Sequence, residues 1–173
     1  MLYDHTSELA VRAVLYLAIR PPGQLSTIRE IARGTALPGP YLAKVLRPLI
    51  RVGLVRAFRG PGGGLELGRA PGEISLLSVV QALDGEAVRD TCVLGLRRCC
   101  ADSPCPLHQR WFPLQQQMQK LLEETTLDSL VHDLTATTPL TPASWMPASG
   151  SATHVRAARP EKRRCRHARV STE

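Results

Sequence analysis

The chain has 173 residues, 43% of them hydrophobic, so it can fill the core of one ordinary domain and leave extensions outside it. It has no 18-residue apolar run and no signal-peptide pattern at its N-terminus, which argues against a membrane span and predicts a cytoplasmic protein. The net charge of +7 is concentrated in residues 41–70 (six Lys and Arg against one acid) and 137–173 (seven against two). A basic stripe on a compact domain favours nucleic acid as the partner.

The first part of the chain predicts three helices. Apolar residues recur at three- and four-residue intervals from Ser7 to Arg20, which indicates an amphipathic helix. A short second helix is expected over Ser26 to Ala32, with Glu30 placed as in a capping box, and a turn is expected from Gly34 to Pro38. A third helix is expected from about Pro40 to Val52.

The third helix has a basic outer face that includes Tyr41, Lys44 and Arg47. A short helix, a turn and a basic-faced helix in this order are typical of the helix-turn-helix, whose last helix enters the major groove of DNA. These three side chains could also form a solvated surface, but their position on this helix favours contact with DNA. Pro48 lies inside the helix, where it removes one backbone hydrogen bond and is expected to kink the last turns.

Two short strands, residues 54–58 and 65–67, are expected around a glycine-rich turn and predict a hairpin wing. Glycines such as Gly60 permit positive φ and close backbone approach, and Arg56 and Arg59 place positive charge at the tip. Both arginines could be ordinary surface charges, but beside a basic helix a role in DNA contact is favoured. A phosphate-binding P-loop is disfavoured because the Gly-Lys-Ser/Thr ending is absent.

The remaining elements are a fourth helix, a long helix and a tail. The fourth helix is expected over Ser75 to Leu83, ending at Asp84-Gly85. Residues from Trp111 to about Leu130 carry an apolar stripe and predict a long helix suited to pairing with its copy in a second subunit. From residue 135 the composition is typical of a disordered tail, and its basic run is more often a nonspecific nucleic-acid tether than a reader of sequence.

Four of the five cysteines lie close together after the fourth helix. In a reducing cytosol an odd number of cysteines is more typical of metal binding or reactivity than of disulfides. Thiolates at Cys92, Cys99 and Cys105, with Cys100 as a spare and His108 nearby, can converge from one loop on a soft metal centre. The alternatives are loop thiols without metal and a zinc site, although the gaps of six and five residues are longer than zinc-binding cysteine pairs usually show.

Together these features resemble the IscR/NsrR-type (Rrf-two) family of bacterial winged-helix regulators over about residues 1–134. The segments that carry the resemblance are Ile31-Ala32, Tyr41-Leu42-Ala43-Lys44-Val45-Leu46, Gly53-Leu54-Val55, Arg59-Gly60-Pro61-Gly62-Gly63-Gly64, Ala82-Leu83-Asp84-Gly85 and the three spaced cysteines. The resemblance implies a homodimer that binds palindromic double-stranded DNA, with the third helix in the major groove and the wing in the minor groove. In many members it also implies an iron–sulfur cluster held by the three cysteines.

Position by position, Cys92, Cys99 and Cys105 match the ligand cysteines of the family, and Cys99 is preferred to Cys100 because it keeps the five-residue gap to Cys105.

The fourth ligand stays open. His108 matches the position used in IscR-like proteins, and Glu8 matches an acidic ligand that the partner subunit supplies in NsrR-like proteins. Each has a simpler explanation, since His108 can be a solvated residue at a helix start and Glu8 an acid that favours a helix N-terminus.

The expected fold is mainly α with a small β wing, a winged helix-turn-helix domain plus a long dimerisation helix. The expected divisions are residues 1–85 for DNA binding, 86–110 for the cysteine-rich cluster loop, 111–134 for the dimerisation helix and end of the fold, and 135–173 for the basic tail.

On this resemblance the expected function is a DNA-binding transcriptional regulator that senses redox state, nitric oxide or iron and cluster supply through a 2Fe-2S or 4Fe-4S cluster. The alternative is a cluster-free repressor of the same family, regulated by a protein or small-molecule partner. An enzyme is not expected, because no partner Asp or Asn for a thiol nucleophile stands at a recognisable spacing and no cofactor motif occurs.

Overall fold

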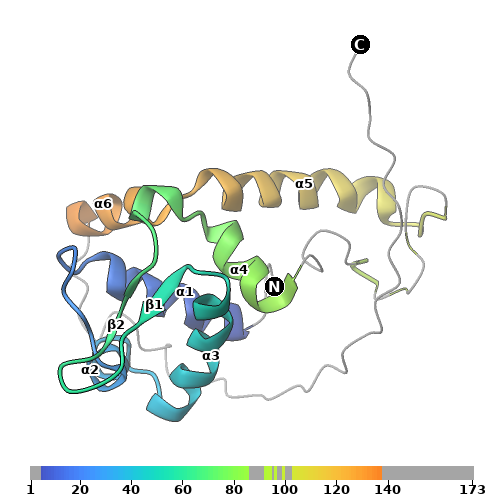
Figure 1. The fold of residues 1–173 in the computed structure, drawn as a ribbon. Helices are drawn as coiled ribbons and strands as arrows, with labels where there is room; N and C mark the ends of the chain where they lie inside the picture. Colours follow the sequence, from blue (N-terminus) through green and yellow to red (C-terminus); the bar gives the residue numbers. More distant parts are fainter. Residues whose placement is uncertain (1–4, 86–91, 95, 97–98, 100–102, 138–173) are drawn as a thin grey trace.

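The computed structural model describes residues 5–85, 92–94, 96, 99 and 103–137 (Figure 1). The elements in chain order are α1 (His5–Ala18), α2 (Ile28–Thr35), α3 (Gly39–Arg51), β1 (Val55–Ala57), β2 (Leu65–Leu67), η1 (Pro71–Glu73), α4 (Leu76–Asp84), α5 (His108–Glu124) and α6 (Leu127–Thr137). The predicted fold class, mainly helical with a small antiparallel wing, is confirmed. Within these described ranges no helix is long and apolar enough to cross a membrane.

The helix α1 forms the centre of the core. It packs against α2, α3, α4 and α6, and Figure 1 shows it between the helix-turn-helix and the long α5–α6 side of the molecule. Its first half buries residues at helical spacing, and in its second half the five consecutive residues 13–17 are all buried, so the helix is enclosed on every side there. The opposing α3 buries Leu42, Val45, Leu46 and Leu49 against it. Each fully buried aliphatic side chain contributes about 1.5–3 kcal/mol, and such residues rather than aromatics supply this core.

A capping box starts α2, as the sequence predicts. Thr27 Oγ1 accepts a hydrogen bond from the backbone N–H of Glu30 at 3.2 Å, and the Glu30 carboxylate accepts one from the backbone N–H of Thr27 at 2.7 Å. This backbone N–H, followed by the Thr27 hydroxyl, holds the pKa of Glu30 below its ordinary value. At the other end, Ala36 takes a φ of 55° and turns the chain into α3. The predicted order of helix, turn and basic-faced helix is confirmed, and α3 continues past Pro48 to Arg51.

The wing is a two-stranded antiparallel sheet. Its register pairs Val55 with Leu67, Arg56 with Glu66 and Ala57 with Leu65. Ser26, just before α2, exchanges two backbone hydrogen bonds of 2.9 and 2.8 Å with Leu65, which ties the wing to the helix-turn-helix. Gly60 has a φ of 101°, and a Cβ on Gly63 would lie 2.4 Å from the Phe58 carbonyl oxygen, so the tight turn requires glycine at both positions.

The long helix expected from Trp111 to about Leu130 is interrupted, and this part of the prediction was wrong. The chain leaves the helix at Thr125, whose ψ is 113°. There the N–H of Leu76 donates to the Thr125 carbonyl, and the N–H of Leu127 donates to the Ile74 carbonyl, each at 2.9 Å. Backbone pairing with residues 74–76, at the start of α4, therefore divides the helix into α5 and α6.

Thr126 gives α6 its own cap. Its hydroxyl accepts a hydrogen bond from the backbone N–H of Ser129 at 3.3 Å, and the Ser129 hydroxyl lies 3.2 Å from the backbone N–H of Thr126. The helix then continues to Thr137, beyond residue 135, where the tail was expected to start. The basic run of the expected tail lies outside the described residues.

Candidate metal centre and nucleic-acid interface

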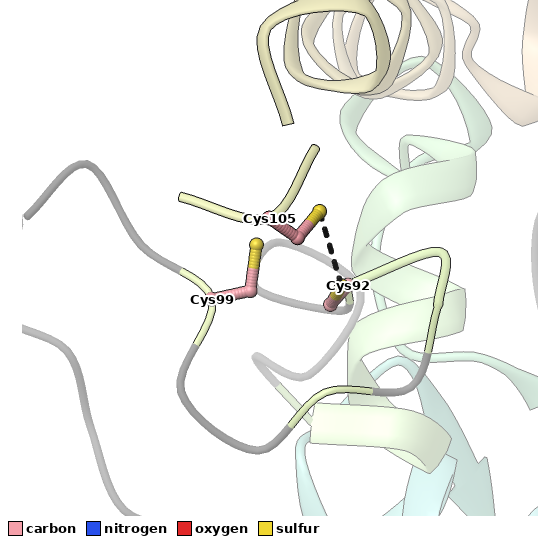
Figure 2. Close-up of side chains that lie close together, drawn as sticks. All are labelled: Cys92, Cys99 and Cys105. Carbon is pink, nitrogen blue, oxygen red and sulfur yellow. Dashed lines mark hydrogen bonds between the residues drawn. The ribbon is translucent and has the colours of Figure 1, made fainter. Parts of the chain in front are cut away.

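Three cysteine side chains converge beside the start of α5 (Figure 2). The sulfur atoms of Cys92, Cys99 and Cys105 all lie within 4.8 Å of one another, and the Cys92 thiol donates to Cys105 Sγ at 3.7 Å. Cys105 is buried, and the other two are half-buried. Three soft sulfur ligands gathered at one point are the donor set that iron–sulfur clusters and other thiophilic metals require. Cys100 and Cys165 lie outside the described residues.

The three thiols influence one another's ionisation. Burial opposes ionisation of Cys92, but the backbone N–H groups of Leu96 and Leu94 and the two neighbouring thiols outweigh it and lower the pKa of Cys92. The backbone N–H of Cys105 favours the Cys99 thiolate, yet burial and the adjacent sulfurs of Cys105 and Cys92 raise the pKa of Cys99 to about 11. The polypeptide thus favours the Cys92 thiolate and opposes the Cys99 thiolate beside it, and a positively charged centre between the sulfur atoms would favour ionisation of both.

His108 lies against this group of thiols. Its Nδ1 is 3.3 Å from Cys99 Sγ, and its ring stacks on Phe112 with centroids 5.5 Å apart and an interplanar angle of 15°. The stacking partner is one helical turn along α5, so both residues follow from the local helix geometry. The structure therefore brings the first candidate for a fourth ligand to the cysteines.

Glu8, the second candidate, is engaged within its own helix. Its carboxylate accepts a hydrogen bond from Arg12 at 2.5 Å and lies 3.2 Å from His5 Nδ1. Among the described residues of one subunit, the mutually close metal-ligand atoms belong to the three cysteines and not to Glu8. A role for Glu8 at the metal centre would therefore need the partner subunit.

The residues predicted to meet DNA occupy α3 and the wing. Lys44 and Arg47 are exposed on α3, and Arg59 and Gly60 are exposed in the wing turn. In the described part of the chain no ion pair involves Lys44, Arg47 or Arg59, so their charges are available to an anionic partner.

Two predicted DNA residues have partners inside the protein. Tyr41 was expected to face outward, but it is half-buried against the core and its hydroxyl lies 3.2 Å from Thr6 Oγ1. Arg56 is exposed and forms an ion pair of 2.7 Å with Glu66 on the neighbouring strand.

Sequence reasoning missed a buried polar contact between α1 and α4. The Ser7 side chain is fully buried, and its hydroxyl donates to the Asp84 carboxylate at 2.9 Å. Asp84 is the last residue of α4, where the helix dipole disfavours a carboxylate. An acid at a predicted helix C-terminus, together with a serine beside an apolar stripe, was the available signal.

Comparison with known proteins adds to this geometry. The sequence model of the Rrf2 family, described as iron-dependent transcriptional regulators, matches residues 3–133. A putative HTH-type transcriptional regulator of Aquifex aeolicus is 33% identical over 135 residues, which cover 76% of this chain and 92% of that protein. The HTH-type transcriptional regulator IscR of Pectobacterium carotovorum is 32% identical over 124 residues, or 72% and 75% of the two chains. The solved structure of T. potens IscR is similar in fold, with a TM-score of 0.63 at 23% identity over 79% of this chain and 90% of that chain.

Proposed function

This chain belongs to the Rrf2 family of transcriptional regulators, and from that premise we propose that it binds a palindromic operator as a homodimer and responds to an iron–sulfur cluster. Regulators of this family bind DNA and are not enzymes, so we place the protein in the cytoplasm, where its DNA is. The observation that carries the sensing part of the proposal is the convergence of Cys92, Cys99 and Cys105 within 4.8 Å.

Contact with DNA is assigned to α3 and the wing. The helix α3 follows the turn at Ala36 and exposes Lys44 and Arg47, as a recognition helix does in the major groove. The wing exposes Arg59 beside Gly60, and a guanidinium there suits a narrow and strongly negative minor groove. Tyr41 is better placed to fix the orientation of α3 than to contact a base, because its hydroxyl lies within hydrogen-bond distance of Thr6 on α1.

Dimerisation is assigned to α5, which runs along one side of the molecule in Figure 1. Leu114 and Leu121 are 52% and 62% exposed, and their seven-residue spacing places both on one face of the helix. Leu122 alone among the described side chains of α5 is buried. An apolar stripe that one subunit leaves in water is suited to an isologous contact with a second copy.

The residues at the metal centre fit an iron–sulfur cluster. The three cysteines would hold it, with His108 as the fourth ligand in one subunit and Glu8 of the second copy as the alternative. When bound, such a cluster supplies a centre whose charge and integrity change with oxidants, nitric oxide and iron supply. Burial of Cys105 and the N–H groups of residues 94 and 96 beside Cys92 would keep two sulfurs fixed and polarised.

The first turn of α1 offers a connection between the metal centre and α3. Thr6 meets Tyr41 at the start of α3, and the next residue, Ser7, meets Asp84 at the end of α4, from which the cysteine loop departs. Glu8 follows directly in the sequence. Two consecutive residues of α1 thus contact α3 and the end of the helix that precedes the cysteine-rich segment, which supports a coupling between the cluster and operator affinity.

The test is a visible spectrum with iron and sulfide analysis of protein purified without oxygen. Thiolate-to-iron absorption with stoichiometric iron and sulfide is the expected result. A colourless, metal-free protein that still binds its operator would support the alternative, a cluster-free regulator of the same family controlled by a protein or small-molecule partner.

A further inference from the structure

Arg56 and Glu66 face each other across the wing. They stand directly opposite in the register of β1 and β2, and Arg56 Nη2 lies 2.7 Å from Glu66 Oε1. Val55, the neighbour of Arg56, is buried in the core, so the alternation of side chains along a strand places the pair on the outer face of the wing. The wing therefore carries a carboxylate, Glu66, on the face that is proposed to contact DNA.

This pair changes the charge of the wing. Residues 54–68 contain Arg56, Arg59 and Glu66, so two positive charges and one negative give a net charge of +1. Arg59 and the three exposed cations of α3, Lys44, Arg47 and Arg51, have no ion pair within the described part of the chain. Arg56 differs from them because it already has a carboxylate partner.

We infer that Glu66 holds Arg56 back from the DNA backbone and thereby lowers affinity for unrelated sequences; the inference rests on the proposed contact between wing and DNA. The side chain of Arg56 is 61% exposed, but that of Glu66 is only 15% exposed. If Arg56 left to neutralise a phosphate, the poorly solvated carboxylate of Glu66 would remain uncompensated beside a polyanion. Phosphate contacts provide most sequence-independent binding, whereas base contacts provide specificity. A cation kept in an internal pair therefore reduces nonspecific binding more than operator recognition.

The test compares the salt dependence of DNA binding in matched variants of the full chain purified without oxygen. Glu66→Gln removes the charge but keeps the size and a hydrogen-bond acceptor for Arg56. Glu73→Gln is the control, because it changes the net charge equally at an exposed carboxylate that has no ion pair within the described residues. The probes are a duplex selected from a random-sequence pool by the wild-type protein and a duplex of the same base composition in shuffled order.

For Glu66→Gln the plot of log affinity against log salt should steepen by about 0.9 per wing, so a fourfold rise in salt should cost about 3.5-fold more affinity per wing than in the wild type. At low salt this variant should bind the shuffled duplex more tightly, and the ratio of operator to shuffled affinity should fall. Glu73→Gln should leave the slope unchanged.

Two further variants separate the pair from a simple charge effect. Arg56→Gln should weaken binding to both duplexes because it leaves Glu66 uncompensated, and adding Glu66→Gln should restore the wild-type slope. Equal slopes for the wild type and Glu66→Gln would overturn this inference and leave the proposed function intact. A wild-type protein that enriched no sequence from the random pool and bound no duplex at any salt concentration would overturn both.

Discussion

At the scale of single residues, the three thiols carry the sensing proposal, and each should be required. Cys92, Cys99 and Cys105 form the close group of sulfurs, so replacement of any one by alanine removes a ligand that the remaining two cannot supply. We expect each variant to lose the visible chromophore and most of its iron and sulfide. Cys100→Ala is the matched control and should keep them; a Cys99→Ala protein with full iron, beside a Cys100→Ala protein without it, would reverse the choice within the doublet.

Arg59 should contribute to operator binding from the wing turn. It is exposed beside Gly60 and has no ion pair in the described residues, so its guanidinium is available to the minor groove. Arg59→Ala should weaken operator binding by about 1–3 kcal/mol, measured by fluorescence anisotropy at physiological salt. Deletion of residues 138–173 should instead weaken binding to all sequences alike and flatten the salt dependence. Unchanged operator affinity in Arg59→Ala would exclude the wing contact.

Which residues gather at the candidate site could be predicted from spacing and residue type, but their pairings could not. The cysteine spacing indicated one metal centre, and the glycine-rich turn indicated the wing. The pairing of Arg56 with Glu66 depends on strand register, and that of Ser7 with Asp84 depends on how α1 crosses α4. Both pairings are set by tertiary packing, which local sequence patterns do not predict.

At the scale of elements, the capping box of α2 predicts how the stability of the fold depends on pH. The backbone N–H of Thr27 lowers the pKa of Glu30 in the folded protein. The ionised Glu30 carboxylate therefore stabilises the fold fully at a pH above its ordinary pKa of 4.5, and this stabilisation is lost as the pH falls through the lower pKa of the folded state. Thr27→Ala should cost about 0.5–2 kcal/mol of unfolding free energy at neutral pH, measured by urea denaturation. Glu30→Gln keeps the box geometry and should remove this part of the acid dependence; identical acid profiles in wild type and Glu30→Gln would refute the assignment.

The apolar face of α5 predicts a dimer contact. Leu121 is 62% exposed in one subunit, so Leu121→Asp should leave the fold of the subunit intact but place a charge in the proposed interface. We expect dimerisation to weaken by at least about tenfold, which corresponds to about 1.4 kcal/mol, in sedimentation equilibrium. Gln116→Asp, on another face of α5, is the control. If Leu121→Asp stays as dimeric as the wild type, this face of α5 is not the interface.

Helices with a regular apolar repeat and a clear cap were predictable, and the break in the last one was not. The apolar stripe continues from α5 into α6, so the periodicity of the sequence predicts one continuous helix. The interruption comes from the backbone hydrogen bonds of Thr125 and Leu127 with residues 76 and 74 at the start of α4, which join residues about fifty positions apart. The pair Thr125-Thr126 was a cap signal, but a local signal competes with the stronger periodic one.

At the scale of the whole molecule, α1 lies between the two proposed sites and contacts elements of both. Thr6 contacts Tyr41 of α3, and Ser7 contacts Asp84 before the cysteine loop, so we propose that a change in that loop alters the position of α3, the proposed recognition helix. In a dimer, two recognition helices must match half-sites about one DNA turn apart, which tolerates little change in their spacing. If Glu8 also reaches the partner's cluster, Glu8→Ala should weaken the response more than His108→Ala does.

The measurement that tests this account most directly compares operator binding by cluster-loaded protein, cluster-free protein and the Cys92→Ala variant at one salt concentration. Coupling between two such sites is typically about 1–3 kcal/mol, so loss of the cluster should change operator affinity by about 5- to 150-fold. Cys92→Ala should behave like the cluster-free protein whether or not iron and sulfide are added. Equal operator affinity in all three would contradict the account, because the cluster would then not control DNA binding.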